Sequence, residues 1–224
     1  MSAITLLGMS GAGKTHFSAR LAGWGWEHYS CDLEIAKLLK IDVRVDDLSN
    51  LSAFIGKIGD PEKGGLLIDE FKRRQKLYYD AEVESLKSIP QATNTGKFVN
   101  DSTGSFCEIT DSKLIASVAK QTKLVYIESD PQTHGDIIAR AKSDPKPLYY
   151  PADRFDTWLD EYCTTHEVSI NKIDPDGFAA WVFPHLFTSR LPKYDTLATQ
   201  YGCKIAAKTL HAVQSEQDFL ELIS

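Results

Sequence analysis

The chain has 224 residues, a formal net charge of -6, 42% hydrophobic residues and 25% charged residues. These values are ordinary for a soluble globular protein with a real core, and the length suggests one domain over residues 1–224. The negative charge excludes broad attraction to nucleic acid or to acidic membranes, so we expect neither as a partner.

The cysteines and the hydropathy of the chain indicate the cellular compartment in which we expect the protein. The four cysteines are scattered with no C-x-x-C pair, which argues against zinc and against a disulfide framework. No run of 18 apolar residues exists, and the first expected strand leaves no room for a signal peptide. We therefore expect a cytoplasmic protein.

A phosphate-binding loop organises the N-terminal part of the chain. Residues 3–7 are apolar and partly β-branched, as in a buried strand, and residues 16–22 have helical spacing. Between them, residues 8–15 read G-M-S-G-A-G-K-T and fit the G-x-x-x-x-G-K-[ST] motif. A coincidental match is the alternative, but the strand before and the helix after favour nucleotide binding.

The chemistry follows from this placement. Backbone N–H groups at a glycine-rich turn and a helix N-terminus hold polyphosphate. Lys14 would reach the β- and γ-phosphates, and the Thr15 hydroxyl would be a ligand of Mg²⁺. The expected nucleotide-binding residues are Gly11, Ala12, Gly13, Lys14, Thr15 and His16.

A second strand, residues 26–30, leads to Asp32. Ligands collect at the carboxyl ends of strands in open α/β sheets, so Asp32 is a candidate to meet an acceptor hydroxyl. Alternatively it is the N-cap of a helix over residues 33–39. The two roles are compatible.

Residues 40–90 are expected to form a substrate-side insertion. It contains a short helix around residues 48–55 and a longer charged one from Gly65 to just before Pro90. Residues 66–70 also resemble an apolar strand followed by the Asp-Glu pair of many NTPases, but good helix formers continue without a break, which favours a helix.

A third strand, residues 97–101, ends at Asp101 and runs into a small-residue turn with Thr103 and Gly104. Such a turn allows a ligand to approach the backbone closely. Asp101 either holds a Mg²⁺-bound water or initiates an Asx turn. A helix over residues 112–120 and a fourth strand over residues 123–128 follow.

The C-terminal half continues the alternation of helices and strands. Helices are expected over residues 131–140, 155–163 and 194–200, a peripheral element over 173–184, a strand over 203–206, and a last helix capped by Ser215 and Asp218. Residues 141–154 carry Lys142, Lys146 and Arg154 among three prolines; they are expected to form a lid, the alternative being an exposed connection. The pattern predicts an α/β fold, a doubly wound five-stranded parallel sheet flanked by helices, with a lid and a small helical insertion.

The arrangement resembles the shikimate kinase family, within the nucleoside-monophosphate-kinase-like P-loop fold. Besides the phosphate loop, three stretches carry the likeness: residues 29–35, like D-x-D-x-x-I; residues 144–148, like the lid's R-P-L-L; and residues 190–198, like R-x-P-L-Y-x-x-x-A.

The resemblance implies roles at matching positions. Asp32 would contact substrate hydroxyls near the attacking oxygen, Arg190 would pair with a substrate carboxylate, and Lys146 would match a lid arginine that acts on the nucleotide phosphates. Lys72 or Arg73 would supply a second carboxylate-binding cation. The alternative for Arg190 is a charge on a helix surface.

Departures from the family pattern concentrate on the substrate side. Ser30 stands for the first Asp of D-x-D, residues 103–105 read T-G-S instead of three glycines, and the lid arginine is Lys146. We therefore expect an ATP- and Mg²⁺-dependent kinase of a small anionic acceptor other than shikimate. The alternatives are a nucleoside or nucleotide kinase, in which Trp24, Trp26 or Tyr29 stacks a base, and a nucleotide switch or accessory ATPase.

Overall fold

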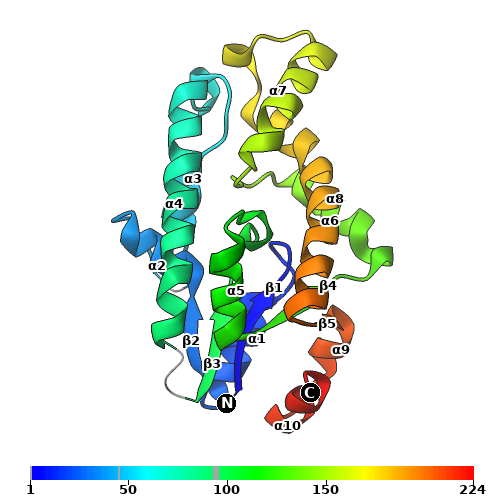
Figure 1. The fold of residues 1–224 in the computed structure, drawn as a ribbon. Helices are drawn as coiled ribbons and strands as arrows, with labels where there is room; N and C mark the ends of the chain where they lie inside the picture. The colour runs from blue at the N-terminus through cyan, green and yellow to red at the C-terminus, as the bar shows by residue number, and fades with distance from the viewer. Residues whose placement is uncertain (1, 45, 93–95) are drawn as a thin grey trace. The chain divides into compact units, whose positions relative to one another are not determined.

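A five-stranded parallel sheet forms the centre of the fold (Figure 1). The computed structural model describes residues 2–44, 46–92 and 96–224. The strands are β1 (Ser2–Leu7), β2 (Glu27–Ser30), β3 (Lys97–Asp101), β4 (Lys123–Glu128) and β5 (Gly202–Ala206). Their order is β2-β3-β1-β4-β5, and every neighbouring pair is parallel. The predicted doubly wound parallel sheet is confirmed.

Helices connect the strands and build the rest of the molecule. Their bounds are α1 (Lys14–Gly23), α2 (Cys31–Leu38), α3 (Ser49–Ile55), α4 (Ile68–Ala92), α5 (Ser112–Gln121), α6 (His134–Ser143), α7 (Ala152–His166), α8 (Pro175–Tyr201), α9 (Ala207–Ala212) and α10 (Glu216–Leu222). The strands and most helices lie where the hydrophobic periodicity predicts them.

The described chain divides into two compact units. The sheet unit comprises residues 1–34, 82–134 and 190–224, and the helical unit comprises residues 35–81 and 135–189. The long helices α4 and α8 contribute residues to both. The expected insertion, residues 40–90, and the expected lid, residues 141–154, fall largely in the helical unit.

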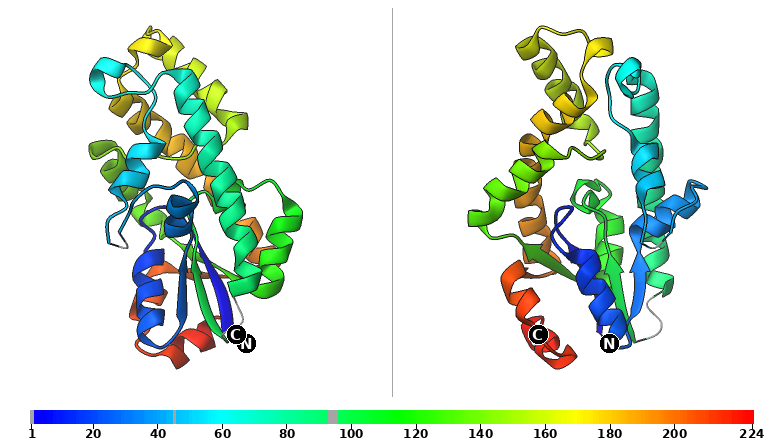
Figure 2. Two further views of the ribbon diagram at one scale, coloured as in Figure 1. Left: turned by 90° about the vertical axis from the view of Figure 1, so that its left-hand side faces the viewer. Right: turned by 180° about the vertical axis from the view of Figure 1, so that it is seen from behind.

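In the sheet unit, helix α1 runs alongside the strands (Figure 2). Alternate side chains of the central strands pack against α1 and α10. Phe17 of α1 and Phe219 of α10 are fully buried, with ring centroids 5.0 Å apart. Burying each such ring contributes about 1.5–3 kcal/mol. The predicted capping box at the start of α10 is present, since the Asp218 N–H donates to Ser215 Oγ at 3.2 Å.

The helical unit has an aromatic core of its own. Phe71 of α4, Phe155 of α7 and Phe178 of α8 are all buried there. Gln75 of α4 donates to the Leu148 carbonyl at 3.1 Å and accepts from the Tyr150 N–H at 2.8 Å. These bonds tie the irregular segment between α6 and α7 to α4.

Helix α8 differs from the prediction. We expected a peripheral element over residues 173–184 and a separate helix over 194–200, but one helix runs over Pro175–Tyr201 with Pro184 and Pro192 inside it. Each internal proline removes a backbone donor, which normally breaks a helix. Buried side chains on both sides of the prolines, such as Phe178 and Tyr194, offset that cost. The irregular segment is also shorter than 141–154, because α6 reaches Ser143 and α7 begins at Ala152.

Candidate functional site

The phosphate-loop motif joins β1 to α1 in a turn that only glycine tolerates well. Gly13, just before α1, has φ 91°, and a Cβ on Gly8 would lie 3.1 Å from the Ile127 carbonyl oxygen. Lys14 Nζ donates to the carbonyl oxygens of Gly8 at 2.8 Å and Met9 at 3.1 Å. The lysine therefore folds back over the loop, where its ammonium faces the concavity that the loop encloses.

A cavity of about 250 Å³ opens in front of this loop, within the sheet unit. It is lined by Ser10, Gly11, Gly13, Lys14, Thr15, His16, Asp32, Asp101, Ser102 and Gly104. Most of the residues predicted for nucleotide, metal and acceptor binding thus share one cavity. Ser10 and Ser102 were not predicted; both are neighbours of predicted residues.

Asp32 lies in the first turn of α2, which begins at Cys31. Its N-cap alternative is wrong, because the helix starts earlier and Ser30 Oγ accepts from the Leu33 N–H at 3.4 Å. Burial raises the pKa of Asp32 to about 6; the Lys14 ammonium lowers it and the Asp101 carboxylate raises it. A carboxyl group with such a pKa can take up a proton near neutral pH.

Asp101 ends β3 and is buried. Its Oδ2 lies 3.9 Å from Nε2 of His28, a buried nitrogen without a hydrogen-bond partner among the described residues. Burial lowers the pKa of Lys14, while the Asp101 and Asp32 carboxylates raise it. A cation thus stands between two carboxylates beside the loop.

Thr103 does not line the cavity. Its hydroxyl donates to Glu82 of α4, and Ser105 Oγ donates to the other carboxylate oxygen of Glu82 at 2.8 Å. Glu82 is buried, which raises its pKa to about 7. Sequence reasoning missed Glu82, although a signal existed: it lies four residues after Tyr78 and four before Leu86, so helical spacing puts it on the same face as these two apolar residues, which are buried.

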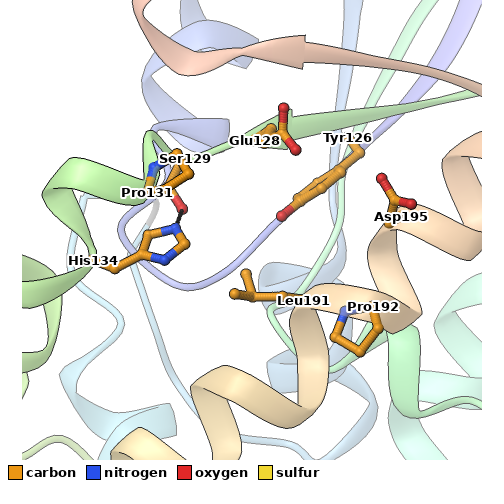
Figure 3. Close-up of a pocket in the computed structure, with 8 residues that line it drawn as sticks. All are labelled: Tyr126, Glu128, Ser129, Pro131, His134, Leu191, Pro192 and Asp195. Atoms are coloured by element: carbon orange, nitrogen blue, oxygen red, sulfur yellow. Dashed lines mark hydrogen bonds between the residues drawn. The ribbon is translucent and has the colours of Figure 1, made fainter.

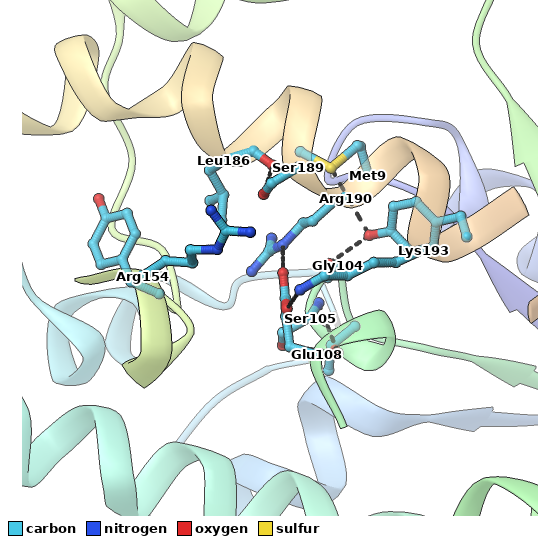
Figure 4. A network of polar contacts seen from close by, with 12 residues as sticks. Met9, Gly104, Ser105, Glu108, Arg154, Leu186, Ser189, Arg190 and Lys193 are labelled. Carbon is cyan, nitrogen blue, oxygen red and sulfur yellow. Dashed lines mark hydrogen bonds and ion pairs between the residues drawn. The ribbon is translucent and has the colours of Figure 1, made fainter. Parts of the chain in front are cut away.

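Arg190 is buried beside this turn, so the alternative of an exposed helix charge is wrong. Its Nε donates to Glu108 Oε1 at 3.0 Å, and Lys193 Nζ pairs with the other oxygen of Glu108 (Figure 4). Tyr194 of the same helix donates to the Gly104 carbonyl at 2.5 Å. Glu108 was not predicted, because no local pattern marks it.

The remaining predicted cations lie in the helical unit and form ion pairs there. Lys146 pairs with Asp144 at 2.7 Å, and Lys72 pairs with Asp156 at 2.7 Å. Arg73 pairs with Glu70 in the first turn of α4, so the alternative of a strand over residues 66–70 is wrong.

The donor set fits a magnesium nucleotide. Thr15, Asp32 and Asp101 offer oxygen ligands, as a hard cation requires, and backbone N–H groups of the loop suit phosphate. No group of three or more His, Cys, Asp or Glu side chains suited to a metal occurs in the described part of the chain. In nucleotide sites Mg²⁺ keeps several waters and binds largely through substrate phosphates.

A glycine-rich loop between the first strand of a parallel sheet and a helix N-terminus defines the P-loop class of folds. Within that class, the chain has the fold of the shikimate kinases. Its structure is similar to that of shikimate kinase from Bacteroides thetaiotaomicron, with a TM-score of 0.51 and 14% identity over 98% of this chain and 93% of that chain. For shikimate kinase from Acinetobacter baumannii in complex with shikimate, the TM-score is 0.50 with 20% identity, covering 99% and 92% of the two chains. For shikimate kinase from Aquifex aeolicus the TM-score is 0.51 with 15% identity, covering 98% of this chain and 92% of that chain.

At the level of sequence, no protein-family model matches the chain and no curated protein matches it. The fold predicted from the motifs is confirmed by the structures, and the low identity agrees with a diverged relative of that fold. Among the described residues, no helix combines the length and apolar character needed to span a bilayer.

Proposed function

We propose that this protein is a kinase that uses ATP and Mg²⁺ to transfer the γ-phosphoryl group to a hydroxyl of a small anionic metabolite. The observation that carries the proposal is the single cavity in which the phosphate loop, Lys14 and Thr15 face Asp32, Asp101 and Gly104. Phosphoryl transfer needs positioning and charge stabilisation rather than a nucleophilic side chain, and this cavity offers both.

In this proposal Lys14 stabilises charge on the β- and γ-phosphates, and Thr15 and Asp101 hold Mg²⁺ directly or through water. Mg²⁺ held by these residues would supply positive charge that neutralises the phosphate oxygens. Asp32 orients the acceptor hydroxyl and accepts its proton, which its pKa of about 6 supports. A role for Lys146 of the expected lid on the nucleotide phosphates stays a prediction.

The anionic acceptor is supported by the charge beside Gly104. Arg190 and Lys193 carry two positive charges against the one negative charge of Glu108, which leaves these three residues a net charge of +1 while Glu82, whose pKa is about 7, is protonated. Gly104 allows a ligand to approach the backbone, and Arg190 would pair with its carboxylate or another anion. Roles for Lys72, Arg73 and Thr103 in acceptor binding stay predictions.

The nucleoside kinase alternative receives less support. Trp26 is buried in the core and donates to Glu216 at 2.7 Å, while Tyr29 donates to the Ser85 carbonyl at 2.7 Å. Both aromatic side chains are thus engaged in the fold rather than exposed to a base.

The four cysteines are unpaired, which supports a reducing compartment, and we propose the cytoplasm.

The test is a panel of hydroxylated acids, including shikimate, and of nucleosides, each incubated with the protein and Mg²⁺-ATP. Products are identified by mass spectrometry. We expect a phosphorylated acid, and we expect Lys14→Ala to reduce turnover by orders of magnitude with an unchanged fold. Lys113→Ala, at an exposed lysine on α5, is the matched control and should have wild-type activity. Wild-type activity of Lys14→Ala would reject the assignment. Tight ATP binding without a phosphorylated acceptor would favour a nucleotide switch.

A further inference from the structure

A second cavity of about 250 Å³ lies in the sheet unit and shares no lining residue with the cavity at the phosphate loop (Figure 3). The end of β4, the segment that leads into α6, and one face of α8 enclose it. None of the residues that line it has a role in the proposed phosphoryl transfer.

Tyr126 of β4 presents a hydroxyl to this cavity. The residue is 4% exposed, and its ring stacks on Tyr194 with centroids 5.2 Å apart. Its hydroxyl has no hydrogen-bond partner among the described residues and is directed into the cavity (Figure 3). Burial, aided by the Glu128 and Asp195 carboxylates, raises the pKa of Tyr126 to about 12, so the group remains a donor at physiological pH. Because this donor opens onto the cavity, an acceptor atom of a bound molecule can reach it.

Two carboxylates give the cavity a negative wall. Lys204 Nζ lies 3.3 Å from Glu128 Oε1 and 2.7 Å from Asp195 Oδ1. One lysine thus forms ion pairs with two carboxylates, and the three side chains together have a net charge of -1. On the side of α6, Ser129 Oγ and His134 Nε2 are hydrogen-bonded to each other at 2.9 Å. The wall therefore favours a positive charge over a negative one.

The opposite side of the cavity is apolar. Leu191 and Pro192 of α8 lie on this side, and the Leu191 side chain points toward the ring of Tyr126 (Figure 3). A fitting molecule thus has an apolar body, an acceptor oxygen for Tyr126 and a cationic group for the carboxylates. We propose that this cavity binds a small organic amine with these three features.

Three phenols that differ only in their end group test the proposal: tyramine (an ammonium), para-ethylphenol (neutral) and phloretic acid (a carboxylate). Each is titrated into the full chain and followed by isothermal calorimetry and by protein NMR shifts. We expect saturable binding of tyramine, weaker binding of para-ethylphenol and the weakest binding of phloretic acid. No saturable binding of tyramine, or equal binding of the three, would overturn the proposal.

Three variants test whether tyramine binds in this cavity. Tyr126→Phe removes one hydroxyl and keeps the ring stack, so the fold should be retained while tyramine binds about five- to tenfold more weakly. Leu191→Trp fills the cavity and should abolish binding. Asp195→Asn, at an exposed carboxylate, should weaken tyramine while leaving para-ethylphenol unchanged. If tyramine binds the Tyr126→Phe protein as tightly as the wild type, the site is elsewhere and the inference fails.

Discussion

Glu108 is the residue whose removal most directly tests the charge arrangement beside Gly104. Its side chain is 1% exposed and bridges Arg190, which is 3% exposed, and the half-exposed Lys193. In Glu108→Gln the shape and one acceptor oxygen remain, but Arg190 becomes a buried cation without a counter-charge from this position. Breaking a buried ion pair on one side costs about 3–5 kcal/mol. Because the amide still accepts a hydrogen bond, we expect the lower end, about 3 kcal/mol.

Urea unfolding monitored by tryptophan fluorescence measures this cost. For a chain of this size, about 3 kcal/mol corresponds to a melting temperature lower by about 6–12 °C. Lys193→Met is the matched control: it removes the exposed partner, leaves Arg190 paired, and should cost no more than about 1 kcal/mol. The double variant Glu108→Leu/Arg190→Met should be more stable than Glu108→Gln, because it removes the buried cation together with its Glu108 carboxylate. If Glu108→Gln unfolds at the wild-type urea concentration, the buried ion pair does not stabilise the fold as argued.

Three further predictions concern other sites. Burial raises the pKa of Glu82 from 4.5 to about 7, so the stability that its protonated form contributes is fully present below pH 4.5 and is lost as the pH rises through about 7. The free energy of unfolding of Glu82→Gln, measured in urea, should therefore be higher than that of the wild type by about 3 kcal/mol at pH 8 and no higher at pH 4. Because Asp32 must be ionised to accept a proton, kcat/KM of the wild type should rise with pH through about 6. Asp32→Asn should lose this rise along with most activity, and an unchanged pH profile in that variant would exclude Asp32 as the base. Ser215→Ala removes the capping box of α10 and should lower the free energy of unfolding by about 1 kcal/mol, measured in urea; no change would mean that the cap is not needed.

The phosphate side of the site was predictable because its geometry is local. Residues 8–15 are consecutive, and the spacing of Gly13 and Lys14 alone specifies the turn and the direction of the ammonium. Asp32 and Asp101 are 69 positions apart, yet each follows a strand, and parallel strands bring their carboxyl ends to one edge of the sheet. Topology alone was enough to bring them together.

The acceptor side depends on packing, which no local pattern reveals. Glu82 meets Thr103 across 21 positions and Glu108 meets Arg190 across 82, and neither pair follows from strand order. Arg190 was found only through a resemblance, and its place inside one long helix was missed, because separate elements were expected over residues 173–184 and 194–200. Glu82 was missed because a charge on an amphipathic helix is normally expected on the solvated face, and Glu108 because it ends a short turn that no local pattern marks.

The same contacts explain how the acceptor side can diverge while the phosphate side stays intact. Where the family pattern has three glycines, Thr103 and Ser105 bring hydroxyls, and a buried carboxylate, Glu82, accepts from both. Glu108 in turn neutralises part of the positive charge of Arg190 and Lys193. Each polar group added near Gly104 is thus matched by a partner from within the chain. An acceptor that binds here would meet a surface whose charges are already partly compensated. It would have to be recognised by its hydrogen bonds and by the remaining charge, which is +1 for Arg190, Lys193 and Glu108 and falls as Glu82 ionises near pH 7.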